Sequence, residues 1–377
     1  MHIVDSTMFW SPTSGGVKTY LLAKRRWLSR QPGMRHSLVV PGEHAGCRDG
    51  VCAVASPPLP FGHGYRFPLR KDSWRRQLLA LSPDIIEAGD PYRPAWAALE
   101  AGKHLQVPVI GFYHSDLPRL VGSRAGHWTN HSLDAYVHRL YSRFDRVLTP
   151  SQVMADKLQV LGLQRVCVQP LGVDVERFHP RLHDPAFRRS LGLDDDVRLL
   201  IFAGRGAREK NLGVLLETLQ RLGRGYHLHL AGSHMPRHLP DNVSRSRDFL
   251  APEEVARRLA SSDALIHAGD RETFGLVVLE AMASGLPVVG VRAGAVAELV
   301  VPGTGLLAAP LSAESLADTV RALFADGWKS MGRLARSHVE QNYAWHRVLQ
   351  QLLGHYRELT GISGDPAMPH GKAAVGG

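Results

Sequence analysis

The segment ETFGLVVLEAMASGLPVV, from Glu272 to Val289, predicts a turn, a helix and a strand in that order. The turn around Gly275 opens the helix, whose apolar residues recur at helical spacing and therefore face a core. Gly285 and Pro287 end the helix before the apolar run VVGV, which is typical of a buried strand. Such a unit belongs to a parallel α/β sheet.

The start of this helix predicts a binding site for phosphate or sugar oxygens. The backbone amides of Phe274, Gly275 and Leu276 have no acceptor within the helix, so they can bind anionic oxygens. Glu272 precedes these amides and Glu280 lies inside the helix. Both carboxylates can accept hydrogen bonds from sugar hydroxyls.

A second segment, IFAGRGAREKN, places two cations after a predicted strand that ends at Gly204. Arg205 and Lys210 precede the helix LGVLLETLQRL, and Arg208 between them is expected to be solvated. Two fixed cations at such a position can stabilise negative charge on a bound anion without a metal ion. The glycines also resemble half of a dinucleotide fingerprint, but the third glycine is missing.

Short runs rich in Val, Ile and Leu recur along the chain, with helical segments between them. The first series is HIVD, SLVV, DIIEA, PVIGFY, RVLT and VCVQ, and the second is VRLLIFAG, YHLHLAG, DALIHAG and LPVVGV. This alternation predicts two doubly wound parallel sheets, and 377 residues suffice for two cores.

Prolines between Pro170 and Pro185 mark the expected break between two Rossmann-like domains. Ligands bind outside the carboxyl ends of parallel strands, so a deep cleft between the domains is the expected site. The predicted divisions are a first domain over 1–175, a second over 185–343, a helix over 344–360 that crosses back, and a disordered tail over 361–377.

Two further candidate sites lie at predicted strand ends. Gly15 and Gly16 occupy the loop after the first strand, where glycine lets the backbone approach a ligand closely. His114, followed by Ser115 and Asp116, ends the strand PVIGFY. A plain turn remains the alternative for the glycine pair, and a core histidine is the alternative for His114.

Charge is unevenly distributed along the chain. Residues 1–180 carry 22 Lys and Arg against 14 Asp and Glu, whereas residues 181–377 carry 23 against 21. The basic first half suits an anionic membrane surface or a phosphorylated substrate, or else serves only as a solubilising surface. No recognition helix, finger or RNA-binding signature accompanies the charge, so nucleic acid is not an expected partner.

Other features argue for a cytoplasmic protein without a metal site. The first residues, MHIVDS, lack a basic leader with an apolar core, and no run approaches the roughly 18 apolar residues of a membrane span. Cys47, Cys52 and Cys167 fit no zinc or disulfide pattern and are expected to be structural thiols. The acidic run at 194–196 is expected to be a solvated turn.

Together these segments resemble the retaining GT-B glycosyltransferases of family 4. Glu272 and Glu280 match the Glu-x7-Glu motif of that family, including the phrase EAMASGLPVV. The resemblance spans roughly Ile3 to Tyr356. It implies two domains facing across a cleft, with Glu272 on the donor sugar and Glu280 on the ribose hydroxyls.

The same resemblance implies roles for the other candidate residues. Arg205 and Lys210 would stabilise the leaving diphosphate, and the loop of Gly15 and Gly16 would approach the diphosphate and the acceptor. His114 would contact the donor sugar and position it, because the leaving phosphate itself accepts the proton in same-face attack. Neither a metal nor another cofactor is then required.

Three segments depart from the family's common pattern. HAGDRE replaces the usual Pro-Ser before the first Glu, Gly232–Met235 replaces Gly-Asp-Gly-Pro, and Ala295 follows Gly294 where paired glycines are usual. The variant HAG…ETFG, with FYHSDLPRL, is most similar to GDP-mannose-dependent glycolipid mannosyltransferases and sulfoquinovosyl diacylglycerol synthases. These changes leave the donor's base and sugar open.

The resemblance implies transfer of an α-hexosyl group, mannosyl in the first instance, from GDP-mannose or a UDP-sugar to a lipid-linked or saccharide acceptor. The setting would be glycolipid or cell-envelope polysaccharide synthesis. A UDP-dependent glucosyl- or sulfoquinovosyl-type transferase, a non-transferring nucleotide-sugar-binding protein, and a GT-B phosphorylase or epimerase are the alternatives. Peripheral membrane attachment is a further hypothesis, through the cluster Arg70, Lys71, Trp74, Arg75 and Arg76.

Overall fold

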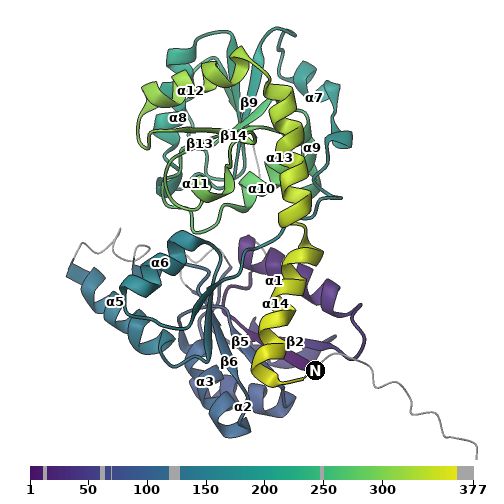
Figure 1. Cartoon of the computed structure of the whole chain (residues 1–377), viewed down its shortest axis with the longest axis vertical. Helices are drawn as coiled ribbons and strands as arrows, with labels where there is room; N and C mark the ends of the chain where they lie inside the picture. The colour runs from purple at the N-terminus through teal and green to yellow at the C-terminus, as the bar shows by residue number, and fades with distance from the viewer. Residues whose placement is uncertain (12–14, 60–63, 69, 119–127, 247–249, 363–377) are drawn as a thin grey trace, which may run out of the picture.

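The structure, a computed structural model, describes residues 1–11, 15–59, 64–68, 70–118, 128–246 and 250–362. Within them the chain forms two α/β domains, one above the other in Figure 1, each built on one sheet. The predicted pair of doubly wound domains is therefore confirmed. Most of the tail predicted to be disordered, from residue 363 onward, lies outside the described residues.

The first sheet has the strand order β3-β4-β2-β1-β5-β6-β7-β8, and only β3 runs antiparallel to its neighbour. Its strands are β1 (His2–Ser6), β2 (Arg35–Gly42), β3 (Gly46–Arg48), β4 (Val51–Ala55), β5 (Ile85–Ala88), β6 (Val109–Phe112), β7 (Arg146–Thr149) and β8 (Val166–Val168). The described helices are α1 (Gly16–Leu28), α2 (Lys71–Leu81), α3 (Arg93–Leu105), α5 (Trp128–Tyr141) and α6 (Gln152–Val160). Every residue of β1 and β5 is buried, because helices cover both faces of these central strands.

The second sheet is parallel throughout, with the order β11-β10-β9-β12-β13-β14. Its strands are β9 (Arg198–Ala203), β10 (Tyr226–Ala231), β11 (Val243–Arg245), β12 (Ala264–Ile266), β13 (Val288–Val291) and β14 (Gly305–Ala308). The helices are η1 (Pro180–Leu182), α7 (Pro185–Ser190), η2 (Arg208–Lys210), α8 (Leu212–Leu222), α9 (Pro252–Ala260), α10 (Leu276–Ala283), α11 (Val296–Leu299), α12 (Ala313–Ala325) and α13 (Trp328–Asn342). Four short strands, β3, β4, β11 and β14, match no run predicted from sequence.

Two chain segments cross between the domains side by side. The Val173 amide donates to the Tyr343 carbonyl at 2.8 Å, and the Trp345 amide donates to the Val173 carbonyl at 3.3 Å. The last helix, α14 (Trp345–Thr360), then runs alongside the first domain (Figure 1). There the Tyr356 hydroxyl donates to Glu87 on β5 at 2.5 Å.

The domains also meet directly at the cleft. Glu298 of α11 accepts hydrogen bonds from the amides of Gln152 and Val153, at 2.8 and 2.6 Å, at the start of α6. The Ser151 hydroxyl donates to the Thr273 carbonyl at 2.8 Å. The loop before α10 is thus held against the first domain.

The cysteine prediction was wrong for two of the three residues. Asp49 and Gly50, both with positive φ, form a two-residue turn that joins β3 and β4. The antiparallel register places Cys47 opposite Cys52, and the structure links them by a disulfide. Cys167 is a free thiol.

The role suggested for Trp74 at a lipid surface was also wrong. Its ring is fully buried beneath α2, and its indole N–H donates to Ser6 Oγ at 2.7 Å. Lys71 forms an ion pair with Glu100. Arg70 and Arg76 remain exposed.

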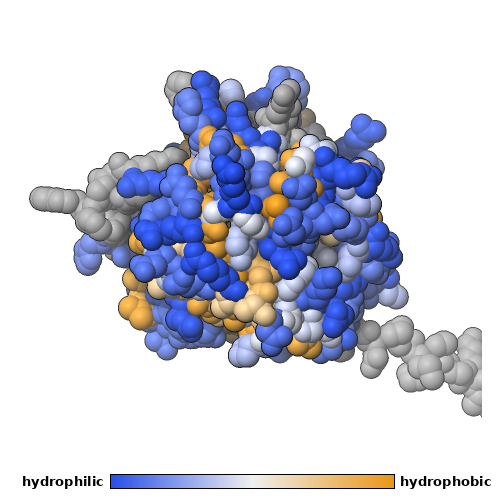
Figure 2. All heavy atoms as spheres, turned by 90° about the horizontal axis from the view of Figure 1, so that it is seen from above, coloured by the Kyte–Doolittle hydropathy of each residue, from blue (hydrophilic) through white to orange (hydrophobic). Residues whose placement is uncertain are grey.

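None of the described helices is both long and apolar enough to span a bilayer. The outer end of the second domain is mainly hydrophilic, with hydrophobic residues in small scattered groups (Figure 2). Residues 194–196 lie exposed in the turn before β9, where the sequence predicted a solvated turn.

Candidate functional site

Glu272 lies between two cationic or hydrogen-bonding partners. Lys210 Nζ forms an ion pair with Glu272 Oε1, and His267 Nε2 lies 3.1 Å from the same oxygen. Burial favours the neutral acid, but the hydrogen bond from His267 and the charge of Lys210 outweigh it and hold the pKa of Glu272 well below its usual range. This carboxylate is therefore ionised at every physiological pH.

The tautomer of His267 follows from its other ring nitrogen. The Gly269 amide donates to His267 Nδ1 at 3.2 Å, so this nitrogen carries no proton in the neutral ring. The proton sits on Nε2, which faces Glu272. His267 is fully buried, and the hydrogen bond from the Gly269 amide orients its ring.

The turn and helix predicted around Gly275 are present. Gly275 directly precedes α10. Its φ of +93° is a backbone conformation that residues with L side chains rarely adopt. Within the described residues, no acceptor binds the amides of Phe274, Gly275 or Leu276. All three residues line one cavity between the domains, so these amides remain available to a ligand.

Two adjoining cavities share Lys210, Glu272 and Thr273. The one beside α10 has a volume of 310 Å³ and reaches Gly16 and His114 of the first domain. The other has a volume of 370 Å³ and is lined by Ser115, Asp116, Arg208, Glu209, Asn211, Asp270, Arg271 and Leu311. Their size is in the range of small-molecule sites.

Gly16 of the first domain lies close to α10. A Cβ at this position would lie 3.0 Å from Leu276 Cδ1, so a larger residue would require the Leu276 side chain to shift. Gly15 has open space around it and does not line the cavity. The two glycines therefore differ in position: Gly16 lines the cavity, whereas Gly15 is only the residue before α1.

His114 is a neutral side chain at the cavity. Its ring stacks on Phe112 with centroids 3.9 Å apart, and burial lowers its pKa to about 3. No described residue hydrogen-bonds to its Nε2. A base with such a pKa binds protons too weakly for general-base catalysis at neutral pH, so the ring is suited to hydrogen bonding.

Arg205 and Glu280 lie apart from the Lys210 and Glu272 pair. Arg205 follows Gly204 with an exposed side chain, and neither it nor Glu280 lines the two cavities. Burial raises the pKa of the Glu280 carboxyl to about 7, although the charge of Arg177 opposes this shift. Of the four residues predicted to hold the donor, the structure therefore brings two into contact.

Four hydrogen bonds around Glu272 were not predicted from sequence. Asn211 Nδ2 donates to Asp270 Oδ1 at 2.9 Å and to the Ala268 carbonyl at 3.0 Å, which ties the Lys210 loop to the HAGDRE loop. The Ala295 amide donates to the Glu272 carbonyl at 3.0 Å. Thr273 Oγ1 donates to the His114 carbonyl at 3.2 Å. In the sequence, only the departures from the family's common pattern at 267 and 294–295 pointed to this region.

The arrangement combines a buried ionised carboxylate, a lysine, free helix amides and a neutral histidine at the ends of β6, β9 and β12. The amides and Lys210 suit phosphate oxygens, whereas Glu272 and His114 suit hydroxyl groups. Such a site fits a molecule that carries both phosphate and sugar.

Known proteins share both the sequence and the fold. Residues 14–177 match Glycosyltransferase Family 4, and residues 197–326 match Glycosyl transferases group 1. The chain is 31% identical over 330 residues to a GDP-mannose-dependent alpha-mannosyltransferase of Mycobacterium tuberculosis (strain CDC 1551 / Oshkosh), a match covering 85% of this chain and 86% of that protein. It is 28% identical over 330 residues to a sulfoquinovosyl transferase of Arabidopsis thaliana, covering 83% of this chain and 64% of that protein.

Among solved structures, sucrose-phosphate synthase from Thermosynechococcus elongatus is similar with a TM-score of 0.79 at 19% identity, covering 96% of this chain and 99% of the other. Anabaena HepE in complex with UDP gives a TM-score of 0.75 at 18% identity, covering 95% and 100%. These likenesses concern the fold, whereas the sequence matches establish the family. The chain belongs to glycosyltransferase family 4 of the glycosyl transferases group 1, and its two domains have the GT-B architecture.

Proposed function

We propose that this glycosyltransferase moves an α-hexosyl group, mannosyl in the first instance, from GDP-mannose to a lipid-linked or saccharide acceptor with retention of configuration. The observation that carries the proposal is the ionised Glu272 held between Lys210 and His267 beside the free amides of α10. The similarity to a GDP-mannose-dependent alpha-mannosyltransferase supports mannose, rather than another hexose, as the transferred sugar.

In the proposed reaction, the bond between the anomeric carbon and the β-phosphate oxygen breaks as the acceptor oxygen bonds to the same face of the sugar. The acceptor proton passes to the departing phosphate. Lys210, Arg205 and the α10 amides stabilise the charge on that phosphate, so no metal is needed. Glu272 and His114 orient the sugar hydroxyls, and Glu280 holds the ribose.

The acceptor would bind to the first domain, whose excess of basic residues suits an anionic lipid surface. Exposed Arg70 and Arg76 can contribute to that attraction, but buried Trp74 cannot. Sedimentation with anionic vesicles at low salt tests this part of the proposal. A protein that stays in the supernatant would refute membrane attachment.

A UDP-sugar-dependent transfer of the sulfoquinovosyl type is the second candidate, because one relative is a sulfoquinovosyl transferase. Calorimetric titration with GDP and with UDP separates the two donors, and tighter binding of GDP is expected.

The transfer itself is tested by incubating labelled GDP-mannose with a lipid extract, and the anomeric configuration of the product is read by NMR. An α-linked mannolipid supports the proposal, whereas a β-linked product or acceptor-independent release of GDP contradicts it.

A further inference from the structure

A separate cavity lies on the outer side of the second domain, between α7, α9 and the edge of the sheet formed by β10 and β11. Its volume is 740 Å³, and it shares no lining residue with the two cavities that hold Lys210 and Glu272. Small-molecule sites have similar volumes, so this cavity is large enough for an organic ligand.

The wall of this cavity on the sheet side is unusually polar. Strand register places Ile201 of β9, His229 of β10 and Ser244 of β11 next to one another, so the face changes from apolar to polar toward its edge. His229 and Ser246 line the cavity. Parallel sheets normally bury Val, Ile and Leu on both faces, so core packing alone does not require this polar strip.

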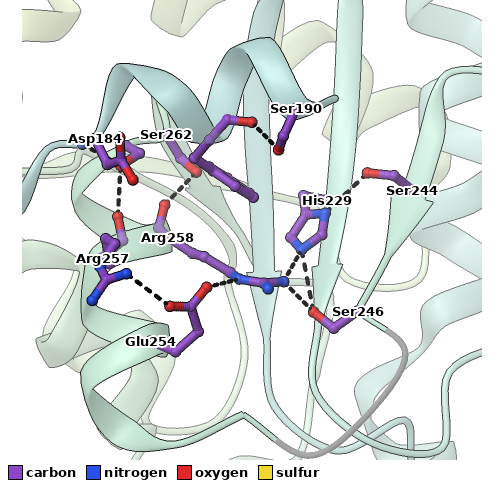
Figure 3. Close-up of polar contacts among 11 residues, drawn as sticks. Asp184, Ser190, His229, Ser244, Ser246, Glu254, Arg257, Arg258 and Ser262 are labelled. Atoms are coloured by element: carbon purple, nitrogen blue, oxygen red, sulfur yellow. Dashed lines mark hydrogen bonds and ion pairs between the residues drawn. The ribbon is translucent and has the colours of Figure 1, made fainter. Parts of the chain in front are cut away.

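Arg258 of α9 is held in place beside this strip (Figure 3). Its Nη1 donates to His229 Nε2 at 2.8 Å and to Ser246 Oγ at 2.5 Å, and its Nε donates to Glu254 Oε1 at 2.9 Å. Burial lowers the pKa of His229 to about 3, so the ring stays neutral and can accept this hydrogen bond. Nη2 takes no part in these three contacts.

The charge around the cavity favours an anion. Arg245, Arg257 and Arg258 line it together with two carboxylates, Glu254 and Asp184. Glu254 pairs with both Arg258 and Arg257, since its Oε2 lies 3.5 Å from Arg257 Nη1. Asp184 accepts a hydrogen bond from the Ala186 amide at 2.8 Å. Arg245 and Arg257 are exposed, so a ligand can reach their guanidinium groups, although Arg245 Nη1 also donates to the Met235 carbonyl at 3.4 Å.

An apolar wall completes the cavity. The Phe187 ring meets the His229 ring edge-on at 5.1 Å, and the Arg258 guanidinium lies 5.4 Å from the Phe187 centroid. Leu191 and Leu250 lie beside it. A ligand with both a charged and an uncharged part would match this arrangement.

We propose that this cavity binds a phosphoryl group carried on a small organic molecule. Arg245, Arg257 and Arg258 hold the phosphate, because the guanidinium fork matches phosphate oxygens. Phe187 and Leu191 contact the organic part. The site is separate from the transfer reaction, and its existence does not depend on the proposed donor or acceptor.

Calorimetric titration of the full chain with a hexose 6-phosphate, the parent hexose and inorganic phosphate tests the proposal. The hexose 6-phosphate is expected to bind, the parent hexose not to bind, and inorganic phosphate to bind more weakly. Arg245→Ala and Arg257→Ala should each weaken hexose 6-phosphate binding about tenfold, the effect of losing one charge-assisted contact. Arg224→Ala removes the same charge from an exposed residue of the same domain and should leave the affinity unchanged.

Lys210→Ala separates this cavity from the donor cleft and should not alter hexose 6-phosphate binding. Loss of affinity in Lys210→Ala, with none in Arg245→Ala or Arg257→Ala, would place the ligand in the donor cleft and overturn the proposal. It is also overturned if the hexose 6-phosphate does not bind, or if inorganic phosphate binds equally well. Thermal unfolding of each variant confirms that these exposed substitutions leave the fold intact.

Discussion

Glu272 shows how far single residues could be predicted. The Glu-x7-Glu motif identified it, and the Arg-x4-Lys segment identified Lys210, although 62 residues separate the two. His267 could be seen only as a departure from the family pattern. Its contact with Glu272 depends on the hydrogen bond from the Gly269 amide and on one tautomer, neither of which a sequence spacing specifies.

Replacement of His267 is expected to raise the pKa of Glu272. In His267→Phe the carboxylate loses a buried hydrogen-bond donor, which corresponds to a shift of about one to two pKa units. The Glu272 carboxyl signal, followed by NMR as a function of pH, should titrate at a higher pH in His267→Phe, and His238→Ala, an exposed histidine, serves as the control. An unchanged titration of the Glu272 carboxyl would show that His267 does not hold the charge on Glu272.

The proposed ribose role of Glu280 predicts that nucleotide binding depends on pH. Its pKa is raised to about 7, so the carboxyl is mostly protonated below that pH and ionised above it. Ribose hydroxyls donate to the ionised form, so affinity should rise about tenfold from pH 6 to pH 8. Calorimetry of wild type and Glu280→Gln measures this, because the variant reports the titration of the nucleotide alone. Identical pH curves for both would refute the ribose role, and Glu217→Gln should behave as wild type.

Two helix starts meet at the cleft, and only one was evident from sequence. Gly275 before α10 could be identified from its position in the motif, because a positive φ favours glycine. The start of α6 receives its carboxylate from Glu298 of the other domain, 146 residues away. Local capping patterns do not reveal such a partner. The hairpin disulfide was missed for a related reason, since it depends on the pairing of two short strands.

Loss of the Glu298 charge should weaken the contact between the domains. Glu298→Gln weakens a cap on α6, and caps of this kind contribute about 0.5 to 2 kcal/mol. The mean separation of the domains should increase, seen as a larger radius of gyration in small-angle X-ray scattering. Glu314→Gln, an exposed residue in the first turn of α12, is the matched control. Scattering curves that coincide for wild type and Glu298→Gln would contradict this role.

A buried polar cluster, which the sequence did not reveal, joins the last helix to the first domain. Lys24 of α1 lies 2.6 Å from Asp5 and 3.2 Å from Glu87, whose carboxylate also accepts from the hydroxyls of Tyr20 and Tyr356. The cluster connects α14 to the centre of the first sheet. Strand and helix periodicity predicted both domains, but polar residues inside strands and helices carry no sign of their partners.

Removal of the Tyr356 hydroxyl should destabilise the protein. In Tyr356→Phe a buried Glu87 oxygen loses its donor, which costs about 1 to 3 kcal/mol. Chemical denaturation measures the change in the free energy of unfolding. Tyr226→Phe is the control, because the Tyr226 hydroxyl makes none of the described hydrogen bonds. Equal stability of Tyr356→Phe and wild type would show that this contact does not anchor α14.

The central claim is that Lys210, paired with Glu272, stabilises the leaving phosphate of a nucleotide sugar. The test is steady-state transfer from GDP-mannose by Lys210→Ala, with donor affinity measured separately by calorimetry. The control is Arg224→Ala, which removes an exposed cation that lines neither cavity of the site. The turnover number of Lys210→Ala should fall at least about a hundredfold, with donor affinity nearly unchanged, because the charge develops only as the bond breaks. Equal losses of turnover and affinity, or unchanged turnover, would contradict the claim.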